Sequence, residues 1–468
     1  MAVKINEFPN DTERQRITSL KKYQRLYENE QFSVLGIHEL IKKHYKNLKD
    51  LIYLAHAVPA RITEFYGDFV QGDVDRLIIQ ADTGSDKDEE WVAEVIYEND
   101  LKERIADYAE DQSQFGFVVF LGWVDSDNKY HIDAVPADQY FPQADGSVVF
   151  ATYKKDPADK DGKKLLLHTQ HYQKENDTII VEHQAFRVNE LGVAIEAYDL
   201  AAMGKLVGRE LKEKETVDGI DELPIRQADN GRRTKWGFGK SDYHDILPQL
   251  SELNERTTHA STVFLKNIDA KLVVPSSSLD EDEKTGEVKL RQQDVYIAES
   301  KEDMIPQYVT NTNPLLADAR EHIAQELKFI EWVTGVPMWA LTRGSAQVEK
   351  VESLRIQLFA AVRKTSKKRA KIKRALLDMF RLGAKMTSQS KDLQTSDINI
   401  DFTDVLPVDE LSQVEAESVK ITSGMSSRKS AMMRVENYTD EEAVAELEQI
   451  KSEDAIAGIG NVNNAPTL

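Results

Sequence analysis

The sequence of 468 residues contains no cysteine. This absence excludes structural disulfides, thiolate metal sites and cysteine nucleophiles. The sequence also has no apolar run near the ~18 residues that a membrane-spanning helix needs, and its N-terminal residues lack the apolar core of a signal peptide. We therefore expect a soluble, intracellular protein with no membrane partner.

Positive charge is scarce: 60 lysines and arginines stand against 81 aspartates and glutamates, a formal net charge of -21. A protein that grips DNA through its phosphates needs clustered cations. Tight DNA binding over the whole surface is therefore not expected, although an acidic protein could still surround DNA that it must not hold. The length predicts about three domain-sized units.

The stretch from Asn313 to Arg381 predicts two helices joined by a short loop. Asn313-Pro314 supplies a cap and a first-turn proline. The residues Thr334-Gly335-Val336-Pro337 end the first helix, because proline cannot continue its hydrogen-bond ladder. From Val348 to about Arg381 neither glycine nor proline occurs. Two long helices of this kind need neighbours, because an isolated helix gains little from its own propensity.

The rest of the chain predicts a mixed α+β organisation. Residues 1–30 are expected to be loosely ordered. Helices are predicted over 37–69, 91–109 and 237–267, and three short acidic helices over 409–452. Strands are predicted at 115–123, 130–135, 147–153, 165–173, 178–186, 206–212, 271–275, 288–291, 295–298 and 398–402.

Gly237-Phe238-Gly239-Lys240-Ser241 is similar to the end of a phosphate-binding loop, in which Lys240 would reach phosphate oxygens. The motif needs a glycine five residues before Gly239, but Thr234 stands there. No buried strand precedes the segment. We favour a turn that leads into a helix and keep a nucleotide triphosphatase as a minor alternative.

Asp82-Thr83-Gly84-Ser85 is similar to the signature of aspartic proteases, in which two carboxylates share a proton. A single copy would require a dimer, and the acidic residues that follow indicate a solvated loop rather than a dry site. A β-turn is the favoured interpretation, with a hydrolase as the alternative.

His168 and His171, with His183 nearby, are candidates for a metal site. Side chains alternate across a strand with a period of two, so a spacing of three does not keep His168 and His171 on one face. We favour histidines of a strand or of the surface, and we expect neither a metal nor another cofactor.

The segment from Arg363 to Arg374 carries a basic cluster without an intervening acid. On a helix, six of its residues fall within an arc of about 140°: Arg363, Lys364, Lys367, Lys368, Lys371 and Arg374. The face is a solvated surface, a surface paired with acidic residues of a neighbouring subunit, or a surface that meets a polyanion. We keep these interpretations open.

The order of several short segments adds a resemblance to a known family. These segments are Leu223, Pro224, Ile225, Asn230, Gly231, Gly239 and Ser241; Leu253-Asn254; Gly335-Val336-Pro337; Ile398, Ile400 and Phe402; and Ser423-Gly424-Met425-Ser426. Together they resemble the portal proteins of tailed bacteriophages, in particular the group typical of long-tailed phages of Gram-positive hosts.

The resemblance implies a portal-like α+β fold with a mixed α/β wing, a long α-helical stem, a small β-containing clip and a C-terminal helical crown. The wing would comprise residues 1–235 and 351–404. The stem helices would lie at 236–268 and 313–336, with the clip at 269–312 between them. The tunnel loop would be 337–350, the crown 405–455, and a disordered tail 456–468.

The resemblance also implies a function. Such proteins form rings, commonly of about twelve subunits, at one capsid vertex of the virion, after assembly in the host cytoplasm. The ring is the channel for double-stranded DNA during packaging and ejection. Further expected partners are the large terminase subunit, a head–tail adaptor, and the scaffolding and major capsid proteins. No catalytic activity is implied.

Two sets of residues follow from the resemblance as expected contacts. The residues expected to touch DNA weakly in the tunnel loop are Trp339, Thr342, Arg343, Ser345, Gln347 and Lys350. The clip tip expected to dock partners is Asp280-Glu281-Asp282-Glu283. The alternative function from the long helices alone is an oligomeric cytoplasmic scaffold that does not handle DNA.

Overall fold

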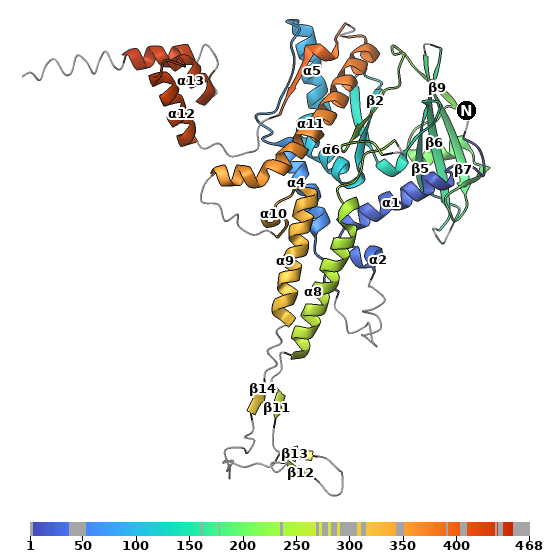
Figure 1. Ribbon diagram of the computed structural model, residues 1–468. Coiled ribbons are helices and arrows are strands. Elements are labelled where there is room, and N and C mark those ends of the chain that lie inside the picture. Colours follow the sequence, from blue (N-terminus) through green and yellow to red (C-terminus); the bar gives the residue numbers. More distant parts are fainter. Residues whose placement is uncertain are drawn as a thin grey trace, which may run out of the picture. The chain divides into compact units, whose positions relative to one another are not determined.

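The computed structural model describes residues 3–36, 53–159, 161, 163–176, 178–234, 237–267, 271–273, 279–281, 288–290, 307–309, 315–342, 351–389, 392–402, 410–435, 438 and 443–452 (Figure 1). The chain divides into two compact units. One is formed by Met1–Ser345 with Leu358–Asp404, and the other by Ala346–Gln357 with Val405–Leu468. Among the described residues, no helix combines the length and the apolar character needed to cross a bilayer.

The larger unit contains two main antiparallel sheets, which confirms the predicted α+β class. The three-stranded sheet has the order β10-β2-β3, with bounds Ile225–Asp229, Phe117–Val124 and Tyr130–Val135. The six-stranded sheet has the order β4-β5-β6-β7-β8, with β9 also paired with β7. Its strands are β4 Tyr140–Pro142, β5 Val148–Lys155, β6 Leu165–Glu175, β7 Thr178–Val188, β8 Ala194–Ala197 and β9 Lys214–Val217.

Helices α4 (Val58–Gln71), α5 (Asp86–Glu98), α6 (Leu101–Phe115) and α11 (Val351–Thr387) contribute to the packing around the three-stranded sheet. The antiparallel strand pair of β1 (Ile78–Ala81) and β15 (Ile398–Asp401) packs into the same hydrophobic core. The core beneath α11 contains Ile372, Leu376 and Phe380, each 0% exposed. The ring of Tyr130 lies against Gly122 of β2 and Gly383 of α11, where any added Cβ would collide with it. Glycine therefore lets the long helix and the sheet approach closely.

A helical arm extends from this unit. Helices α8 (Leu247–Asn267) and α9 (Leu315–Thr334) pack side by side (Figure 1). Beyond them, β11 (Lys271–Val273) pairs antiparallel with β14 (Gln307–Val309), and β12 (Leu279–Glu281) pairs with β13 (Val288–Leu290). The predicted small β insertion between two helices is therefore present. The strand predicted at 295–298 lies outside the described residues.

The N-terminal segment departs from its predicted loose order. It forms α1 (Asp11–Tyr27) and α2 (Gln31–Leu35). The side chain of Asn10 accepts from the Glu13 amide, and the Glu13 side chain accepts from the Asn10 amide, a capping box that starts α1. Leu20, Tyr23 and Leu26 are buried in α1. The prediction was wrong because polar flanks hid this apolar face.

Four other predictions need correction. The helix predicted over 91–109 is two helices, α5 and α6, because Asp100 adopts a left-handed conformation with φ 46° between them. The strand predicted at 206–212 is absent: residues 206–207 end helix α7 (Leu200–Val207), which is capped by the Asp199 carboxylate, and residues 208–212 form a turn and a loop. The connection predicted after Pro337 begins with a short helix, α10 (Met338–Thr342). Helix α11 continues past its predicted end at Arg381 to Thr387.

Short 3-10 turns lie at Ala137–Gln139, His244–Ile246 and Thr395–Asp397. The smaller unit contains α12 (Glu410–Thr422), α13 (Arg428–Val435) and a helix over residues 443–452. The Glu417 carboxylate accepts from Lys420 Nζ at 2.7 Å and from Arg434 Nη2 at 2.8 Å. This pairing links α12 to α13.

Candidate functional site

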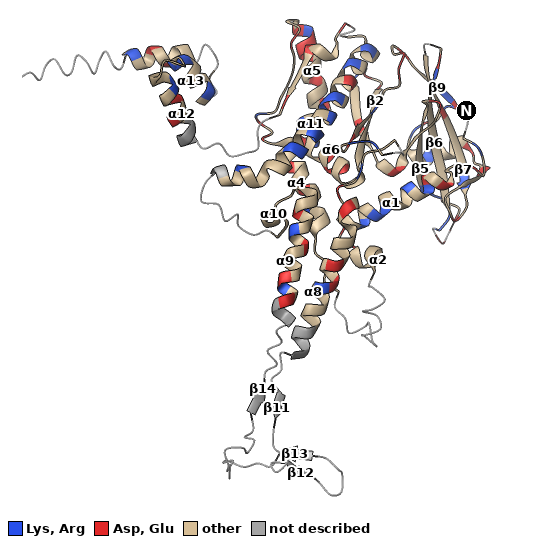
Figure 2. Ribbon diagram, in the orientation of Figure 1, with Lys and Arg blue, Asp and Glu red and all other residues tan. Residues whose placement is uncertain are grey.

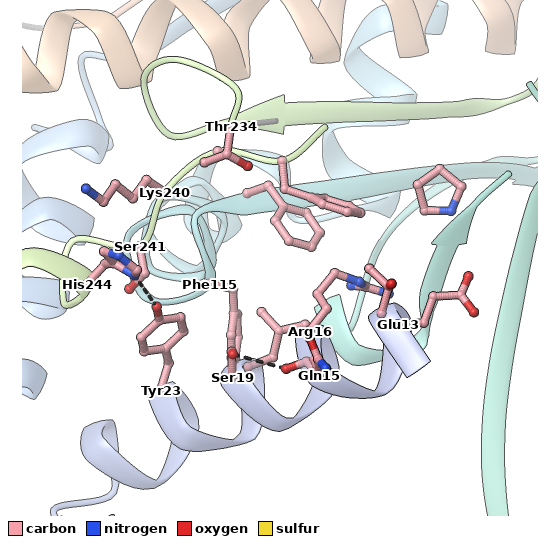
Figure 3. A pocket seen from close by; sticks show the side chains of 16 residues that line it. Glu13, Gln15, Arg16, Ser19, Tyr23, Phe115, Thr234, Lys240, Ser241 and His244 are labelled. Carbon is pink, nitrogen blue, oxygen red and sulfur yellow. Dashed lines mark hydrogen bonds between the residues drawn. The ribbon is translucent and has the colours of Figure 1, made fainter. Parts of the chain in front are cut away.

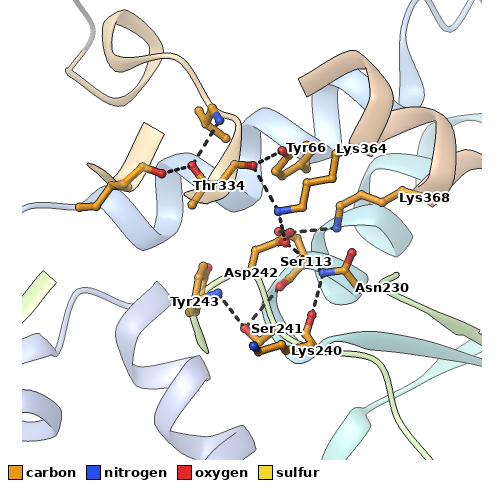
Figure 4. Close-up of polar contacts among 12 residues, drawn as sticks. Tyr66, Ser113, Asn230, Lys240, Ser241, Asp242, Tyr243, Thr334, Lys364 and Lys368 are labelled. Atoms are coloured by element: carbon orange, nitrogen blue, oxygen red, sulfur yellow. Dashed lines mark hydrogen bonds and ion pairs between the residues drawn. The ribbon is translucent and has the colours of Figure 1, made fainter. Parts of the chain in front are cut away.

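Just before the predicted tunnel loop, side chains of two other helices donate hydrogen bonds to one backbone carbonyl of α9. We call this meeting point of helices the junction. At the C-terminal end of α9, the carbonyl oxygen of Thr334 accepts from the Tyr66 hydroxyl at 2.6 Å and from Lys364 Nζ at 3.2 Å (Figure 4). Carbonyls at a helix end lack partners within the helix. Side chains of α4 and α11 supply the missing donors, so three helices meet at this point.

Asp242 lies at the centre of the same junction. Its carboxylate pairs with Lys364 Nζ at 2.6 Å and with Lys368 Nζ at 3.0 Å. It also accepts from Ser113 Oγ at 2.7 Å and from Asn230 Nδ2 at 3.1 Å. Figure 4 shows these groups converging from α6, α11 and the loop after β10.

Burial makes this cluster electrostatically strong. The Asp242 side chain is 3% exposed and the Lys368 side chain is 1% exposed. Burial by itself would raise the pKa of Asp242, but the ammonium groups of Lys368 and Lys364 outweigh it and hold that pKa below its ordinary value. Burial lowers the pKa of Lys368 to about 8, against the opposing pull of Asp242. At neutral pH the pair is therefore ionic.

The aromatic ring of Tyr66 also contacts the two lysines of this cluster. The ammonium nitrogens of Lys364 and Lys368 lie 5.2 Å and 4.9 Å from the ring centre. A cation within ~6 Å of an aromatic face is attracted by the ring quadrupole. The cluster thus joins α4, α6, α9, α11 and the loop after β10, at the end of α9 that is followed by α10.

The six residues of the predicted basic face divide into two groups. Lys364 and Lys368 turn inward to Asp242, so they do not belong to an exposed face. The prediction of one continuous face was wrong for these two, because a buried carboxylate from a distant loop pairs with both, leaving Lys368 buried and Lys364 only partly exposed. The other four are exposed: Arg363, Lys367, Lys371 and Arg374.

The structure places only part of the predicted tunnel loop and clip tip. Trp339 and Thr342 lie in α10, where Trp339 is half-buried and Thr342 is exposed. Thr342 Oγ1 donates to the Met338 carbonyl at 2.9 Å. In the clip tip, Asp280 and Glu281 lie in β12. The remaining predicted residues lie outside the described residues: Arg343, Ser345, Gln347, Lys350, Asp282 and Glu283.

The motif around Lys240 has a structural explanation. Lys240 Nζ pairs with Asp245 Oδ1 at 2.6 Å. A Cβ at Gly239 would collide with the Gly116 carbonyl oxygen and lie 2.6 Å from the Asn230 nitrogen. The glycine therefore allows two backbone segments to touch, and the lysine is engaged in a local ion pair.

A cavity of about 640 Å³ lies between this loop and α1 (Figure 3). Arg16 of α1 donates to the carbonyls of Ala137 and Tyr140, and its guanidinium lies 4.8 Å from the Phe238 ring centre. Tyr23 and His244 are hydrogen-bonded to each other at 3.0 Å. The wall thus combines the aromatic rings of Tyr23, Phe115, Phe117 and Phe238 with polar side chains, and its two described cations, Arg16 and Lys240, are engaged with the protein itself.

The surroundings of Asp82 and of the three histidines also have structural explanations. Asp82 lies on the surface after β1, and its amide donates to the Asp397 carbonyl at 2.7 Å. His168 and His183 are buried, with His168 Nε2 3.2 Å from His183 Nδ1. His171 Nε2 lies 2.8 Å from Ser147 Oγ. Within the described part of the chain, no group of three or more His, Asp or Glu side chains could hold a metal ion.

Sequence reasoning missed Asp242 and Tyr66. Asp242 follows Ser241 in a loop, without helical or strand periodicity, and Tyr66 reads as an ordinary apolar-face residue of α4. The four-residue spacing of Lys364 and Lys368 places both on one face of α11, which was a signal in the sequence that this face contacts an anion. The identity of that anion depended on the fold.

Comparison with known families matches residues 8–457 to the family described as "Phage portal protein, SPP1 Gp6-like". Two solved structures share 10% sequence identity with the chain. "Neck of empty GTA particle computed with C6 symmetry" has a TM-score of 0.43, over 83% of this chain and 92% of that chain. "Neck of native GTA particle computed with C12 symmetry" has a TM-score of 0.38, over 81% and 89%. The comparison with curated proteins finds no match.

The family match begins before α1 and ends beyond the helix at 443–452. It therefore includes both sheets, the helical arm with its β insertion, the Asp242 junction, α11 and the C-terminal helices. The chain belongs to the SPP1 Gp6-like family of phage portal proteins.

Proposed function

We propose that copies of this chain assemble into a closed ring at one vertex of a phage capsid, as the channel for double-stranded DNA during packaging and ejection. The observation that carries this proposal is the family match over residues 8–457. The protein acts as a structural conduit rather than as an enzyme. About twelve copies, the usual number in this family, form the ring.

Exposed aromatic residues on the long helices support assembly. Trp332 of α9 is 79% exposed and packs edge-on against Phe329 of the same helix, with ring centres 5.7 Å apart. Phe359 of α11 is 61% exposed. Large apolar side chains gathered on a helix mark an interaction surface. In the proposed ring, neighbouring copies cover these rings through a contact repeated around the axis.

The charge of the chain suits a conduit. A net charge of -21 leaves few cations to neutralise phosphates, so translocating DNA slides instead of being held. The tunnel loop, residues 337–350, meets the DNA lightly through Trp339, Thr342, Arg343, Ser345, Gln347 and Lys350. The Asp242 junction lies at the C-terminal end of α9, after which this loop begins.

The arm and its β insertion make the external docking platform. Residues 236–268 and 313–336 are the stem, and residues 269–312 are the clip, with the acidic tip Asp280-Glu281-Asp282-Glu283. The clip binds the large terminase subunit during packaging and the head–tail adaptor afterwards. Residues 1–235 and 351–404 form the wing, and residues 405–455 the crown, which together meet scaffolding and major capsid proteins.

Electron microscopy of the purified protein, with native mass spectrometry, tests the proposal. We expect closed rings of about a dozen copies around a channel wide enough for duplex DNA. A closed particle without a channel would contradict the proposal and would favour a scaffold that does not handle DNA.

A further inference from the structure

Helix α11 presents a row of exposed cations, here called the basic stripe: Arg363, Lys367, Lys371 and Arg374. Their spacings of four, four and three residues keep them on one flank of the helix. All four are exposed, and none forms an ion pair with a described residue. Figure 2 shows the lysines and arginines along α11. Lys364 and Lys368 lie on the adjoining flank, where both pair with Asp242.

A second surface of the same unit carries crowded carboxylates, here called the acidic patch: Glu64, Asp68, Asp107, Glu110 and Asp111. They come from α4 and α6, which are in contact. Glycine at position 67 of α4 leaves room for Glu110 of α6, because a Cβ added there would lie only 2.8 Å from Glu110 Cγ. Arg61 pairs with Glu64 at 2.6 Å. No other ion pair to a described cation reaches the patch.

The crowding has an electrostatic cost in the single chain. Burial raises the pKa of the Asp111 carboxyl to about 7, and the negative charges of Asp107 and Glu110 contribute to this increase. Burial and neighbouring carboxylates also raise the pKa of Glu110 and of Asp68. Each of these pKa increases indicates that the ionised carboxylate is disfavoured at its position, and a nearby cation would stabilise it.

The two surfaces face different directions. Tyr66 of α4 lies under the ammonium groups of Lys364 and Lys368, so this side of α4 faces α11. Glu64 and Asp68 are two residues before and after Tyr66, which places them on the opposite side of α4. Glu64 and Asp68 thus point away from α11, and among the described residues of one chain no ion pair joins the basic stripe to the acidic patch.

We propose that the basic stripe of each subunit docks on the acidic patch of the adjacent subunit. This inference rests on the ring of the proposed function and names one contact that closes it. Complementary surfaces on different faces of one chain give a heterologous contact, which closes into a ring when repeated by rotation. Four cations then meet five carboxylates. Double-stranded DNA on the stripe would leave the patch without a partner, so the second copy is the better-matched occupant.

Charge reversal with rescue tests the docking. Lys367→Glu with Lys371→Glu reverses the stripe, and Asp68→Lys with Asp107→Lys reverses the patch. Native mass spectrometry and sedimentation, at roughly 0.15 M ionic strength, measure the fraction of ring. Each double variant should weaken ring assembly about tenfold or more, and all four changes in one chain should restore it. Matched controls of equal charge change, Lys205→Glu with Lys212→Glu and Glu89→Lys with Glu90→Lys, should assemble as the unmodified chain does.

Circular dichroism of the dissociated subunits establishes that each variant is folded before assembly is scored. Rings that tolerate either reversal overturn the docking, as does a folded four-change variant that fails to recover. Intact rings of the stripe variant with reduced DNA packaging also overturn it and assign the stripe to DNA. If the unmodified chain forms no ring under any salt condition, the proposed function itself fails, which is a separate result.

Discussion

Asp242 illustrates how a single residue can organise a helix junction. A carboxylate moved into the protein interior loses its hydration, and only well-placed partners repay that loss. Asp242 has four such partners within 3.1 Å, two of them cationic. The arrangement is costly to break from one side, because Lys368 would remain buried without a counterion.

We expect Asp242→Asn to lower the free energy of unfolding by about 3–5 kcal/mol, since it strands Lys368 in the interior. Urea unfolding at pH 7 measures the change. The control is Asp245→Asn, which breaks the half-exposed pair with Lys240 and should cost at most about 1 kcal/mol. Equal losses for the two variants would contradict the role given to the Asp242 cluster.

Asp111 gives a prediction about pH. Burial and the neighbouring carboxylates raise its pKa to about 7 in the folded chain, above the ordinary value of an aspartate, so the folded state binds the proton more tightly. Stability from this group is therefore present at low pH and declines as pH rises from about 4 to about 7.

Asp111→Asn should accordingly stabilise the dissociated subunit at pH 8, by on the order of 1–3 kcal/mol, and change it little at pH 4. Denaturant unfolding at the two pH values measures the difference. Asp127→Asn, on the exposed turn between β2 and β3, should change stability little at either pH. The same gain at pH 4 as at pH 8 would show that burial of Asp111 is not the cause.

At the scale of elements, the turn after β10 depends on glycine for two different reasons. Gly237 has φ +83° with open space around it, and Gly239 faces the Gly116 carbonyl and the Asn230 amide. The first glycine satisfies a backbone conformation, and the second allows close contact between two segments.

Gly237→Ala should therefore cost about 1–2 kcal/mol from the left-handed conformation alone. Gly239→Ala should cost more, about 3 kcal/mol, because the backbone atoms it meets cannot rotate away as a side chain could. Thermal unfolding of the two variants measures the difference in stability. A smaller loss for Gly239→Ala would refute the close approach.

At the scale of the whole molecule, the lack of cysteine makes the DNA channel testable. A single introduced cysteine is a unique attachment site for biotin and streptavidin. In the proposed ring, a label at Arg343→Cys lies in the channel and should abolish packaging, because the bound streptavidin obstructs the path of DNA.

Nuclease-protected DNA in a packaging reaction with terminase and proheads measures this outcome. Thr83→Cys, on an exposed turn after β1, is the control and should package DNA with or without the label. Normal packaging by rings labelled at residue 343 would remove the tunnel loop from the DNA path.

Local chemistry explains why much of the organisation was predictable from sequence. The helix end at Gly335-Val336-Pro337, the hairpin of β2 and β3, and the small β insertion between α8 and α9 follow from caps, breakers and apolar periodicity. The absence of cysteine excluded disulfides and thiolate sites, and the net charge of -21 argued against tight DNA binding over the whole surface. The order of elements was specific enough to predict the portal family, which the match over residues 8–457 confirmed.

Only the tertiary structure decided which charged residues are buried together. The sequence shows Lys364 and Lys367 as equivalent members of one basic run. The fold brings Asp242 from a distant loop onto the flank of Lys364 and Lys368, and leaves Lys367 in solvent. Contacts between residues far apart in the chain leave no periodic trace, because their geometry depends on the packing of whole elements. For the same reason, the opposite placement of the basic stripe and the acidic patch emerges only from the folded chain.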